Sequence, residues 1–169
     1  PRSTVGTVTE IHDYLRLLYA RAGTPHCPEH PEHALEAQSV SQMVDAVLAL
    51  PEETKLMIVA PLISGRKGEQ ADLFVELRAQ GFVRVRVDGI VHELDNLPVL
   101  DKNRRHSIEV VVDRIKVRQD LRGRLAESFE TALTHAEGRA IAVEMDTGTE
   151  HLFSAKFACP ICSFALAEL

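Results

Sequence analysis

The chain has no tryptophan, and it holds only two tyrosines, six phenylalanines and three cysteines among its 169 residues. Because aromatic residues are scarce while 45% of the residues are hydrophobic, we expect a core built from aliphatic side chains. An odd number of cysteines argues against a disulfide framework and is typical of reduced thiols that bind a metal. No run approaches the ~20 apolar residues of a membrane span. The sequence therefore predicts a cytoplasmic protein that does not cross a membrane.

The common catalytic signatures are also missing. No G-x-x-x-x-G-K-[ST] motif occurs, and the glycine pair Gly65 and Gly68 is too closely spaced to form a P-loop. The motifs H-E-x-x-H, G-x-S-x-G and G-x-G-x-x-G are absent as well. We therefore predict that the chain is not itself an enzyme. It starts with Pro1 rather than methionine and shows no charged-then-apolar leader, which predicts a segment of a longer protein.

The charge is unevenly distributed along the chain. The formal net charge of −6 argues against a general nucleic-acid binder. Residues 66–124, however, contain 13 of the 19 Lys and Arg residues and 10 of the 25 Asp and Glu residues, a surplus of three positive charges. The middle of the chain is therefore the part in which we expect an anionic partner to bind.

Helix signals recur at four places. Thr7-x-x-Glu10 and Ser39-x-x-Gln42 are capping boxes, in which two side chains satisfy free N–H groups at a helix start. Glycines after apolar residues at helical spacing mark helix ends. These signals predict helices over about 8–22, from Ser39 to Pro51 and around 73–77 before Gly81. A fourth helix is predicted from Asp120, which is expected to cap its start, to Gly138.

Strand signals lie between these helices. Residues 82–87 alternate strictly, so that the valines point one way and Arg84 and Arg86 the other. Asp88-Gly89 is a strong two-residue hairpin signal and predicts a return strand over 90–94. Further strands are predicted over 55–60, 108–117, 140–145 and 151–157, with loops at 61–68 and 95–106.

The order of these elements predicts an α/β fold in which helices pack on a mixed β-sheet, because strand-helix-strand units need a crossover that lies on the sheet face. We divide the chain into a helix and metal-turn segment at 1–37, a main domain at 38–150, and a return strand with a cysteine turn at 151–169.

Two short turns carry the residues expected to bind a metal. Cys27-Pro-Glu-His30 lies near the start and Cys159-Pro-Ile-Cys162 near the end of the chain. Together the two turns offer three thiolates and one imidazole, which can close a tetrahedral, structural zinc site that leaves no open coordination position. In one alternative, Cys27 is not a metal ligand, and Cys159 and Cys162 pair with cysteines beyond residue 169. His26 or His33 is also near enough in sequence to replace His30.

A second candidate site is the basic middle of the chain. Arg84 and Arg86 share a face of one strand, Arg114 and Lys116 end another, and Lys67 lies in a loop. Arginine presents a rigid fork that suits carboxylate or phosphate, so an acidic protein and a phosphate backbone fit equally well. A simply solvated charged face is the alternative.

Several long motifs resemble one family. The sequences Gln38-Ser-Val-Ser-Gln-Met-Val-Asp45, Lys116-Val-Arg118 and Phe153-Ser-Ala-Lys-Phe-Ala-Cys-Pro-Ile-Cys162 resemble an inserted region of the bacterial UvrA family, and so does Leu125-Ala-Glu-Ser-Phe-Glu-Thr-Ala-Leu133. UvrA proteins are dimeric damage-recognition ATPases of nucleotide excision repair with two ABC-type modules. The resemblance implies that this chain is the insertion that binds UvrB, the helicase-like partner. It also implies that ATP, magnesium and most contacts with damaged DNA involve parts of the parent outside this chain.

The resemblance assigns roles to particular residues. Its zinc pattern falls on Cys27, His30, Cys159 and Cys162, and its UvrB-binding arginines fall on Arg84 and Arg114. We group Arg86, Lys67 and Lys116 with these two as UvrB-binding residues because they belong to the same basic segment. A module that binds the DNA backbone directly through this segment is the alternative function.

Overall fold

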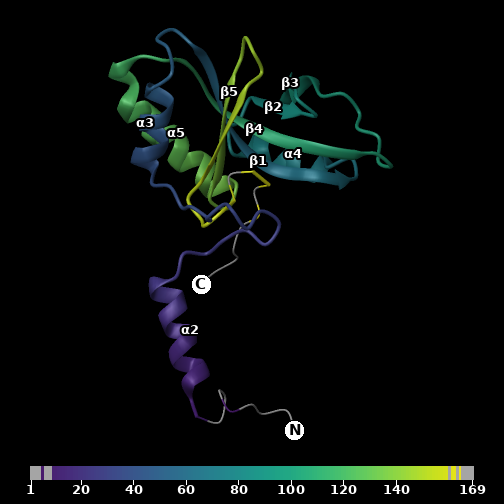
Figure 1. Ribbon diagram of the computed structural model, residues 1–169. Helices are drawn as coiled ribbons and strands as arrows, with labels where there is room; N and C mark the ends of the chain where they lie inside the picture. The colour runs from purple at the N-terminus through teal and green to yellow at the C-terminus, as the bar shows by residue number, and fades with distance from the viewer. Residues whose placement is uncertain (1–4, 6–8, 160, 163, 165–169) are drawn as a thin grey trace. The chain divides into compact units, whose positions relative to one another are not determined.

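The structure of the chain is a computed structural model that describes Val5 and residues 9–159, 161, 162 and 164 (Figure 1). The chain divides into two compact units, one made of Pro1–Ala37 and Lys156–Leu169, the other of Gln38–Ala155. No helix among the described residues is long and apolar enough to cross a membrane.

The smaller unit contains helix α2 (Ile11–Ala22), the loop that follows it, and the segment around Ala158 and Cys159. α2 begins later than the predicted start at residue 8, and Thr7 of the predicted capping box lies outside the described residues. After the helix, Glu36 and Ala158 exchange both backbone hydrogen bonds, each 3.1 Å long, in an isolated antiparallel bridge. This bridge joins the segments that carry the two predicted metal turns.

The larger unit contains the helices α3 (Val40–Leu48), α4 (Ala71–Ala79) and α5 (Arg122–His135). The capping box at the start of α3 is confirmed: the N–H of Gln42 donates to Ser39 Oγ (3.2 Å) and the N–H of Ser39 donates to Gln42 Oε1 (2.8 Å). The glycine stop after α4 is confirmed too, because Gly81 has a φ of 90° and the N–H of Phe82 donates to a carbonyl in the last turn of α4.

The prediction that Asp120 caps α5 is wrong. Asp120 lies inside a 3-10 turn, η2 (Gln119–Leu121), and the residue before the first turn of α5 is Leu121, whose side chain makes no capping bond. The extra turn moves the capping position by one residue, from Asp120 to Leu121, so the carboxylate of Asp120 is no longer at the position that caps the free N–H groups.

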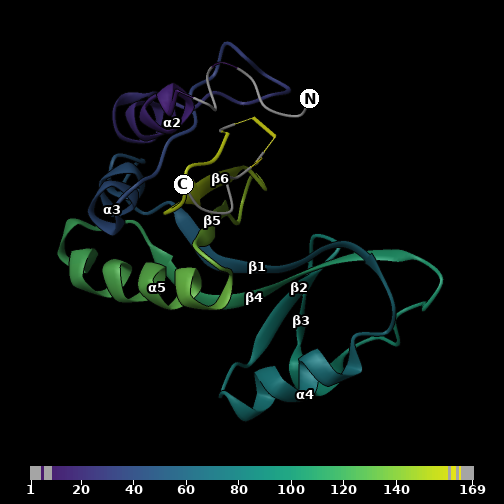
Figure 2. The ribbon, with the colours of Figure 1, turned by 90° about the horizontal axis from the view of Figure 1, so that it is seen from below.

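The strands of the larger unit form one six-stranded sheet in the order β3-β2-β4-β1-β5-β6 (Figure 2). Its strands are β1 (Lys55–Lys67), β2 (Arg84–Val87), β3 (Ile90–Glu93), β4 (Arg105–Lys116), β5 (Arg139–Glu144) and β6 (Glu150–Ser154). A 3-10 turn, η1 (Leu94–Asn96), follows β3. The predicted combination of helices with a sheet is confirmed.

Every strand pair in this sheet is antiparallel, which differs from the mixed pairing we expected. The crossovers themselves are present. β1 and β2 run parallel on either side of β4 and are linked through α4, while β4 and β5 run parallel on either side of β1 and are linked through α5. The two strand-helix-strand units are therefore split, and each receives a strand of the other in its gap, so that parallel strands never become neighbours.

The predicted loop at 61–68 is also wrong, because β1 continues to Lys67. Beyond Pro61 it stays paired with β4, from Ile63 opposite Ile108 to Lys67 opposite Arg105, with register shifts on both sides of Ile63. A bulge accommodates proline and glycine within a strand, since it releases ladder hydrogen bonds locally. Pairing with a distant strand thus overrides the local turn composition.

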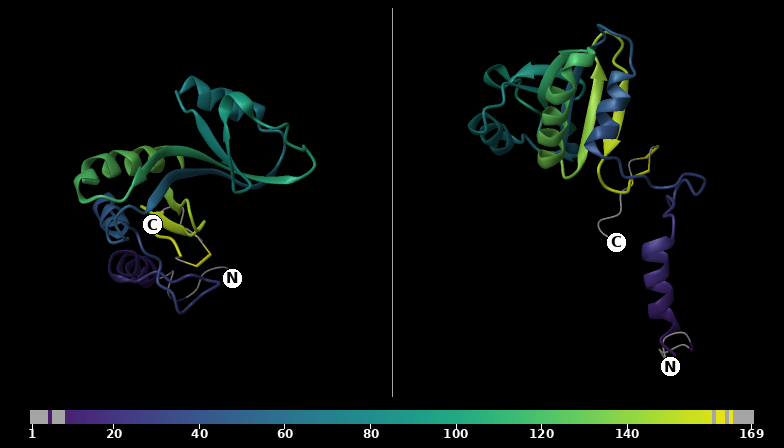
Figure 3. Two further views of the ribbon diagram at one scale, coloured as in Figure 1. Left: turned by 90° about the horizontal axis from the view of Figure 1, so that it is seen from above. Right: turned by 90° about the vertical axis from the view of Figure 1, so that its left-hand side faces the viewer.

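The main core lies between the sheet and the helices. α3, α4 and α5 all contribute side chains to this core (Figure 3). Alternate strand residues such as Ile58 and Val110 point to the same core, in which Phe129 of α5 is fully buried. Phe129 and Phe153 meet edge to face with ring centroids 5.3 Å apart. The expectation of a mainly aliphatic core is confirmed.

The other face of the sheet has a small apolar cluster made only of strand residues: Met57, Val59, Val111, Ile141 and Val143. On this face Arg86 in β2 binds Glu109 in β4, with Nη2 donating to Oε1 at 2.9 Å, and it also binds Glu150 in β6. β2 and β6 are separated by three strands in the sheet. The sheet therefore curls until its second and sixth strands meet, and Arg86 closes it over the cluster.

This network corrects the expectation that Arg86 presents its side chain beside Arg84 on an exposed strand face. Arg86 is only 7% exposed. Its burial would lower the pKa of its guanidinium, but hydrogen bonds to Glu109 and Glu150 outweigh that effect and raise the pKa. The side chain thus links β2 to β4 and β6 through the ion pairs of its buried guanidinium.

A second ion pair ties the hairpin to β4. The hairpin turn at Asp88-Gly89 is confirmed, with φ values of 49° and 85°. His106 Nδ1 lies 2.7 Å from Asp88 Oδ2, and its Nε2 donates to the carbonyl of Asp101 (2.9 Å). The hydrogen bond to Asp88 raises the pKa of His106 above its ordinary 6.5, although Arg104 opposes it. Burial would raise the pKa of Asp88, but its bonds to His106 and Ser107 lower it.

We predict that Arg86→Leu lowers the free energy of unfolding by about 3–5 kcal/mol, because it leaves two carboxylates facing each other without their cation. Arg84→Leu, two residues earlier on the same strand face, is the matched control and should cost less than about 1 kcal/mol. Urea unfolding measures both. Equal losses in the two variants would show that the network does not hold the sheet.

We predict that the pair His106–Asp88 stabilises the fold only within a pH window. The contribution is lost as pH rises through the raised pKa of His106, because the imidazolium deprotonates, and as pH falls through the lowered pKa of Asp88. Asp88→Asn keeps the turn, since Asn-Gly also favours it. The difference in urea midpoint between wild type and this variant should shrink towards both limits. A difference that stays constant with pH would contradict the account.

Candidate metal centre and basic grooves

The two predicted metal turns meet within the smaller unit. One ligand atom from each of Cys27, His30, Cys159 and Cys162 lies within 4.8 Å of the other three. Backbone hydrogen bonds shape the first turn: the N–H of Cys27 donates to the carbonyl of His33 (3.1 Å), and the N–H of His33 donates to that of His30 (2.9 Å). The turn folds back on itself, which points a sulfur and a ring nitrogen to the same side.

The distances within this cluster fit a tetrahedral ion. Cys27 Sγ lies 3.5 Å from Cys162 Sγ and 3.7 Å from His30 Nδ1, and Cys159 Sγ lies 3.9 Å from the same nitrogen. Zinc bonded to sulfur at ~2.3 Å and to nitrogen at ~2.0 Å would place these atoms about 3.5–3.8 Å apart. Cys27 and Cys159 are 1% and 3% exposed, and all three cysteines are free thiols. The four residues could hold a metal ion.

The structure distinguishes His30 from its neighbours. His26 Nδ1 hydrogen-bonds the carbonyl of Pro31 (2.8 Å), and His33 lies 3.7 Å from the carboxylate of Glu32. Neither belongs to the cluster of potential ligands among the described residues. Only His30 shares the cluster with the cysteines.

The thiols influence one another. Burial would raise the pKa of Cys159, but backbone N–H groups of Cys162 and Ile161 lower it to about 7. At Cys162 a backbone hydrogen bond from Phe164 lowers the pKa, but burial and the sulfurs of Cys27 and Cys159 raise it to about 11. The cluster thus resists the accumulation of negative charge.

Arg84 and Arg114 line one groove of about 330 Å³ in the larger unit, beside the start of β2. β2 leaves β4 at this point, since the pairing of the two strands ends at Val85 opposite Val110. The rest of the wall comes from residues 81–83 before β2 and residues 111–113 of β4. Arg84 is half-buried and Arg114 is exposed. Neither side chain forms an ion pair with another described residue.

The one carboxylate that lines this groove is already occupied. Asp113 accepts hydrogen bonds from Arg124 Nε (2.8 Å) and Nη2 (2.7 Å) and from Ser128 Oγ (2.9 Å). Burial would raise the pKa of Asp113, but these bonds and the N–H of Arg114 lower it. The carboxylate remains ionised and faces α5, so Arg84 and Arg114 keep their charge available.

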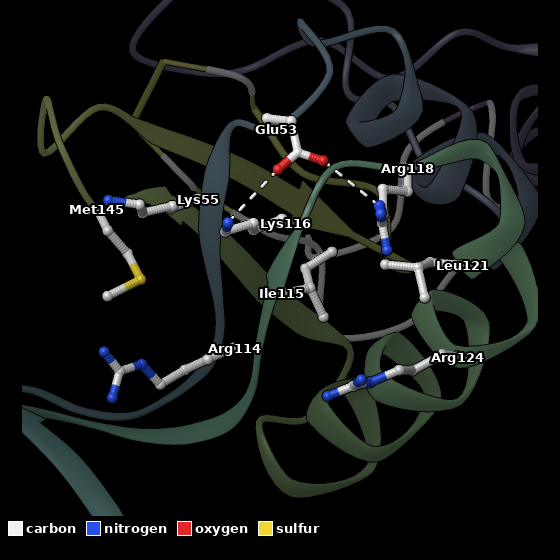
Figure 4. A pocket seen from close by; sticks show the side chains of 9 residues that line it. All are labelled: Glu53, Lys55, Arg114, Ile115, Lys116, Arg118, Leu121, Arg124 and Met145. Carbon is white, nitrogen blue, oxygen red and sulfur yellow. Dashed lines mark ion pairs between the residues drawn. The ribbon is translucent and has the colours of Figure 1, made fainter.

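Arg114 also lines a second, larger groove of about 490 Å³, at the start of β1 and the end of β4 (Figure 4). Its cations are Lys55, Arg114, Lys116, Arg118 and Arg124. Its single lining carboxylate is Glu53, which lies 3.4 Å from Lys116 Nζ and 3.4 Å from Arg118 Nε. The groove is therefore strongly cationic.

The predicted basic residues do not form one patch. The structure brings Arg114 together with Arg84 in one groove and with Lys116 in the other. Lys67 is opposite Arg105, whereas Arg114 is opposite Met57, so Lys67 lies about 30 Å along the ladder from Arg114. Arg86 is buried. Sequence reasoning missed Glu53, Lys55 and Arg124, because each reaches the second groove from a different element and no local motif marks them.

Comparison with known proteins identifies the family of this chain. The family model described as the UvrA interaction domain matches residues 38–146. The chain is 66% identical over 169 residues to UvrABC system protein A of Neisseria meningitidis serogroup A / serotype 4A, 64% identical over 172 residues to that of Pseudomonas aeruginosa, and 57% identical over 171 residues to that of Xylella fastidiosa. In each case the match takes in 100% of this chain but only 18% of the relative. The chain belongs to the UvrA family, and it contains that family's interaction domain.

Proposed function

We propose that this chain is the module through which a UvrA protein binds UvrB, and that acidic groups of UvrB occupy the groove between Arg84 and Arg114. The observation that carries the proposal is the pairing of these two arginines in one groove with no carboxylate of the larger unit to neutralise them. Guanidinium groups held on a sheet are oriented in advance, which favours bidentate binding of carboxylates.

The two arginines should contribute differently to binding. Arg114 is exposed, so it acts mainly through the association rate and its dependence on salt. Arg84 is half-buried, and its carboxylate partner would lose more water on binding. Truncation of a desolvated charge of this kind costs about 2–5 kcal/mol. Lys116 and Lys67 would add to long-range attraction, and Arg86 would act indirectly by fixing the strand that carries Arg84.

The proposal places the chain within a larger cytoplasmic protein of nucleotide excision repair. That parent would form a homodimer, bind ATP and magnesium in its ABC-type modules, and contact damaged DNA largely outside this segment. This chain would then supply recognition of a partner rather than chemistry, in keeping with its lack of catalytic motifs.

We further propose that Cys27, His30, Cys159 and Cys162 bind a structural zinc ion. Three sulfurs and one nitrogen are a donor set that zinc prefers, and four protein ligands leave no position for a substrate. The ion would join two segments that are far apart in sequence, next to the backbone bridge between Glu36 and Ala158 and the buried contact of Leu35 with Cys27 and Cys159.

We predict that Arg84→Glu together with Arg114→Glu abolishes UvrB binding in calorimetric titration, because like charges then meet across the groove. Lys102→Glu together with Arg105→Glu changes the net charge equally at another place and is the matched control. The control should retain binding, and wild-type binding should weaken with salt. Unchanged binding by the first variant, or equal loss in both, would refute docking through this groove.

We predict one zinc per chain by elemental mass spectrometry, lost in His30→Ala and Cys159→Ser but retained in His26→Ala and His33→Ala. The two retained histidines are controls from the same loop. Cobalt substitution should give the intense visible absorption of a tetrahedral site with thiolate ligands. Zinc that persists in His30→Ala and disappears in His33→Ala would show that His33, and not His30, is the nitrogen ligand.

A further inference from the structure

The geometry points to a second binding site in the larger groove, where the phosphates of a nucleic-acid backbone bind to Lys55, Lys116 and Arg118 and where Glu53 covers the site when it is empty. This inference concerns a different groove and a different ligand from the proposed UvrB contact. It does not depend on that proposal, because Lys55, Arg118 and Glu53 do not line the groove of Arg84.

The cations of this groove come from three separate segments. Lys55 begins β1, Lys116 and Arg118 lie at the end of β4, and Arg124 lies in the first turn of α5. A concave surface lined by one sign of charge concentrates its field and attracts ions of the other sign. The side chains of Lys55, Lys116 and Arg118 are 51%, 57% and 62% exposed, so a ligand can reach them from solvent.

The carboxylates near these cations do not neutralise them. Glu53 is shared by Lys116 and Arg118, and Lys55 has one contact of 3.6 Å, to the largely exposed Asp146. Arg114 has no ion-pair partner among the described residues, and Arg124 alone is held by a close bidentate carboxylate. Solvent-exposed ion pairs of this kind contribute little energy, so their cations exchange easily to another anion.

Glu53 is held over the groove by a constrained backbone. Its φ of 67° lies in the left-handed region, which is unfavourable for a residue other than glycine. The N–H of Glu53 donates to the carbonyl of Val117 (3.0 Å), and the N–H of Val117 donates to the carbonyl of Thr54 (2.9 Å). These bonds fix the turn to the end of β4, between Lys116 and Arg118. Figure 4 shows the carboxylate of Glu53 between the two cations, with Arg114 and Arg124 further away.

The lining favours a phosphate backbone over other anionic polymers. The residues that line the groove include no aromatic ring on which a base could stack, so the groove reads charge and not sequence. An acidic protein would need a buried aromatic or arginine anchor at its centre, whereas the exposed cations of this groove surround a floor of Ile115 and Leu121. Exposed lysine and arginine that release counterions are the usual partners of backbone phosphates.

The test is fluorescence anisotropy of a fluorescein-labelled DNA duplex of mixed sequence, titrated with the 169-residue chain over a series of salt concentrations. Lys55→Gln together with Arg118→Gln should reduce the slope of log affinity against log salt by about 2, since each phosphate contact contributes about 0.9. Lys102→Gln together with Arg105→Gln is the control for net charge. All four residues are exposed, so thermal unfolding should show the same fold in each variant.

Glu53 provides a test of opposite sign. Glu53→Gln should raise DNA affinity several-fold because it releases two cations, whereas Glu52→Gln, an equal change of charge at the exposed neighbour, should raise it much less. If each variant and its control changed DNA affinity equally, the effect would depend on net charge alone, and the inference of a binding site in this groove would be overturned. Loss of UvrB binding in Lys55→Gln with Arg118→Gln, while DNA binding is unchanged, would assign the groove to the protein partner instead.

Discussion

The buried contact of Arg86 with Glu109 and Glu150 is the constraint on which the shape of the larger unit depends. A guanidinium that is 7% exposed would be costly without its carboxylates, and the two carboxylates come from strands that are not neighbours of each other. Glu109 reaches the guanidinium from the neighbouring strand, whereas Glu150 on β6 reaches it only because the sheet curls. The same curl shelters the strand-only apolar cluster around Val59 and fixes the start of β2 relative to the end of β4.

The grooves follow from that geometry. Arg84 lies two residues before Arg86 on the same strand, and Arg114 lies on the strand that pairs with it. The network therefore sets how the half-buried Arg84 and the exposed Arg114 face each other. β4 ends in a second groove that shares Arg114 with the first. One curved sheet thus presents two cationic sites of different character: a narrow one lined by unpaired arginines, and a wide one partly masked by Glu53.

Local signals in the sequence were sufficient where the structure itself is local. The capping box of Ser39, the glycine stop at Gly81 and the hairpin at Asp88-Gly89 each depend on a few consecutive residues, and all are present. Predictions failed where distant segments decide. Pairing with β4 extends β1 through Pro61. Ion pairs with Glu109 and Glu150 allow the guanidinium of Arg86 to be buried. The second groove could not be foreseen, because Glu53 and Arg124 come to line the same groove only after folding.

Arginine modification by phenylglyoxal, read by mass spectrometry with and without UvrB, tests the central claim most directly. In the free chain Arg84 and Arg114 should react while the buried Arg86 does not. In the complex Arg84 and Arg114 should be protected, and the distant Arg105 should react as before. Reactive Arg86 would contradict the curled sheet, and unchanged reactivity of Arg84 and Arg114 in the complex would contradict docking of UvrB at their groove.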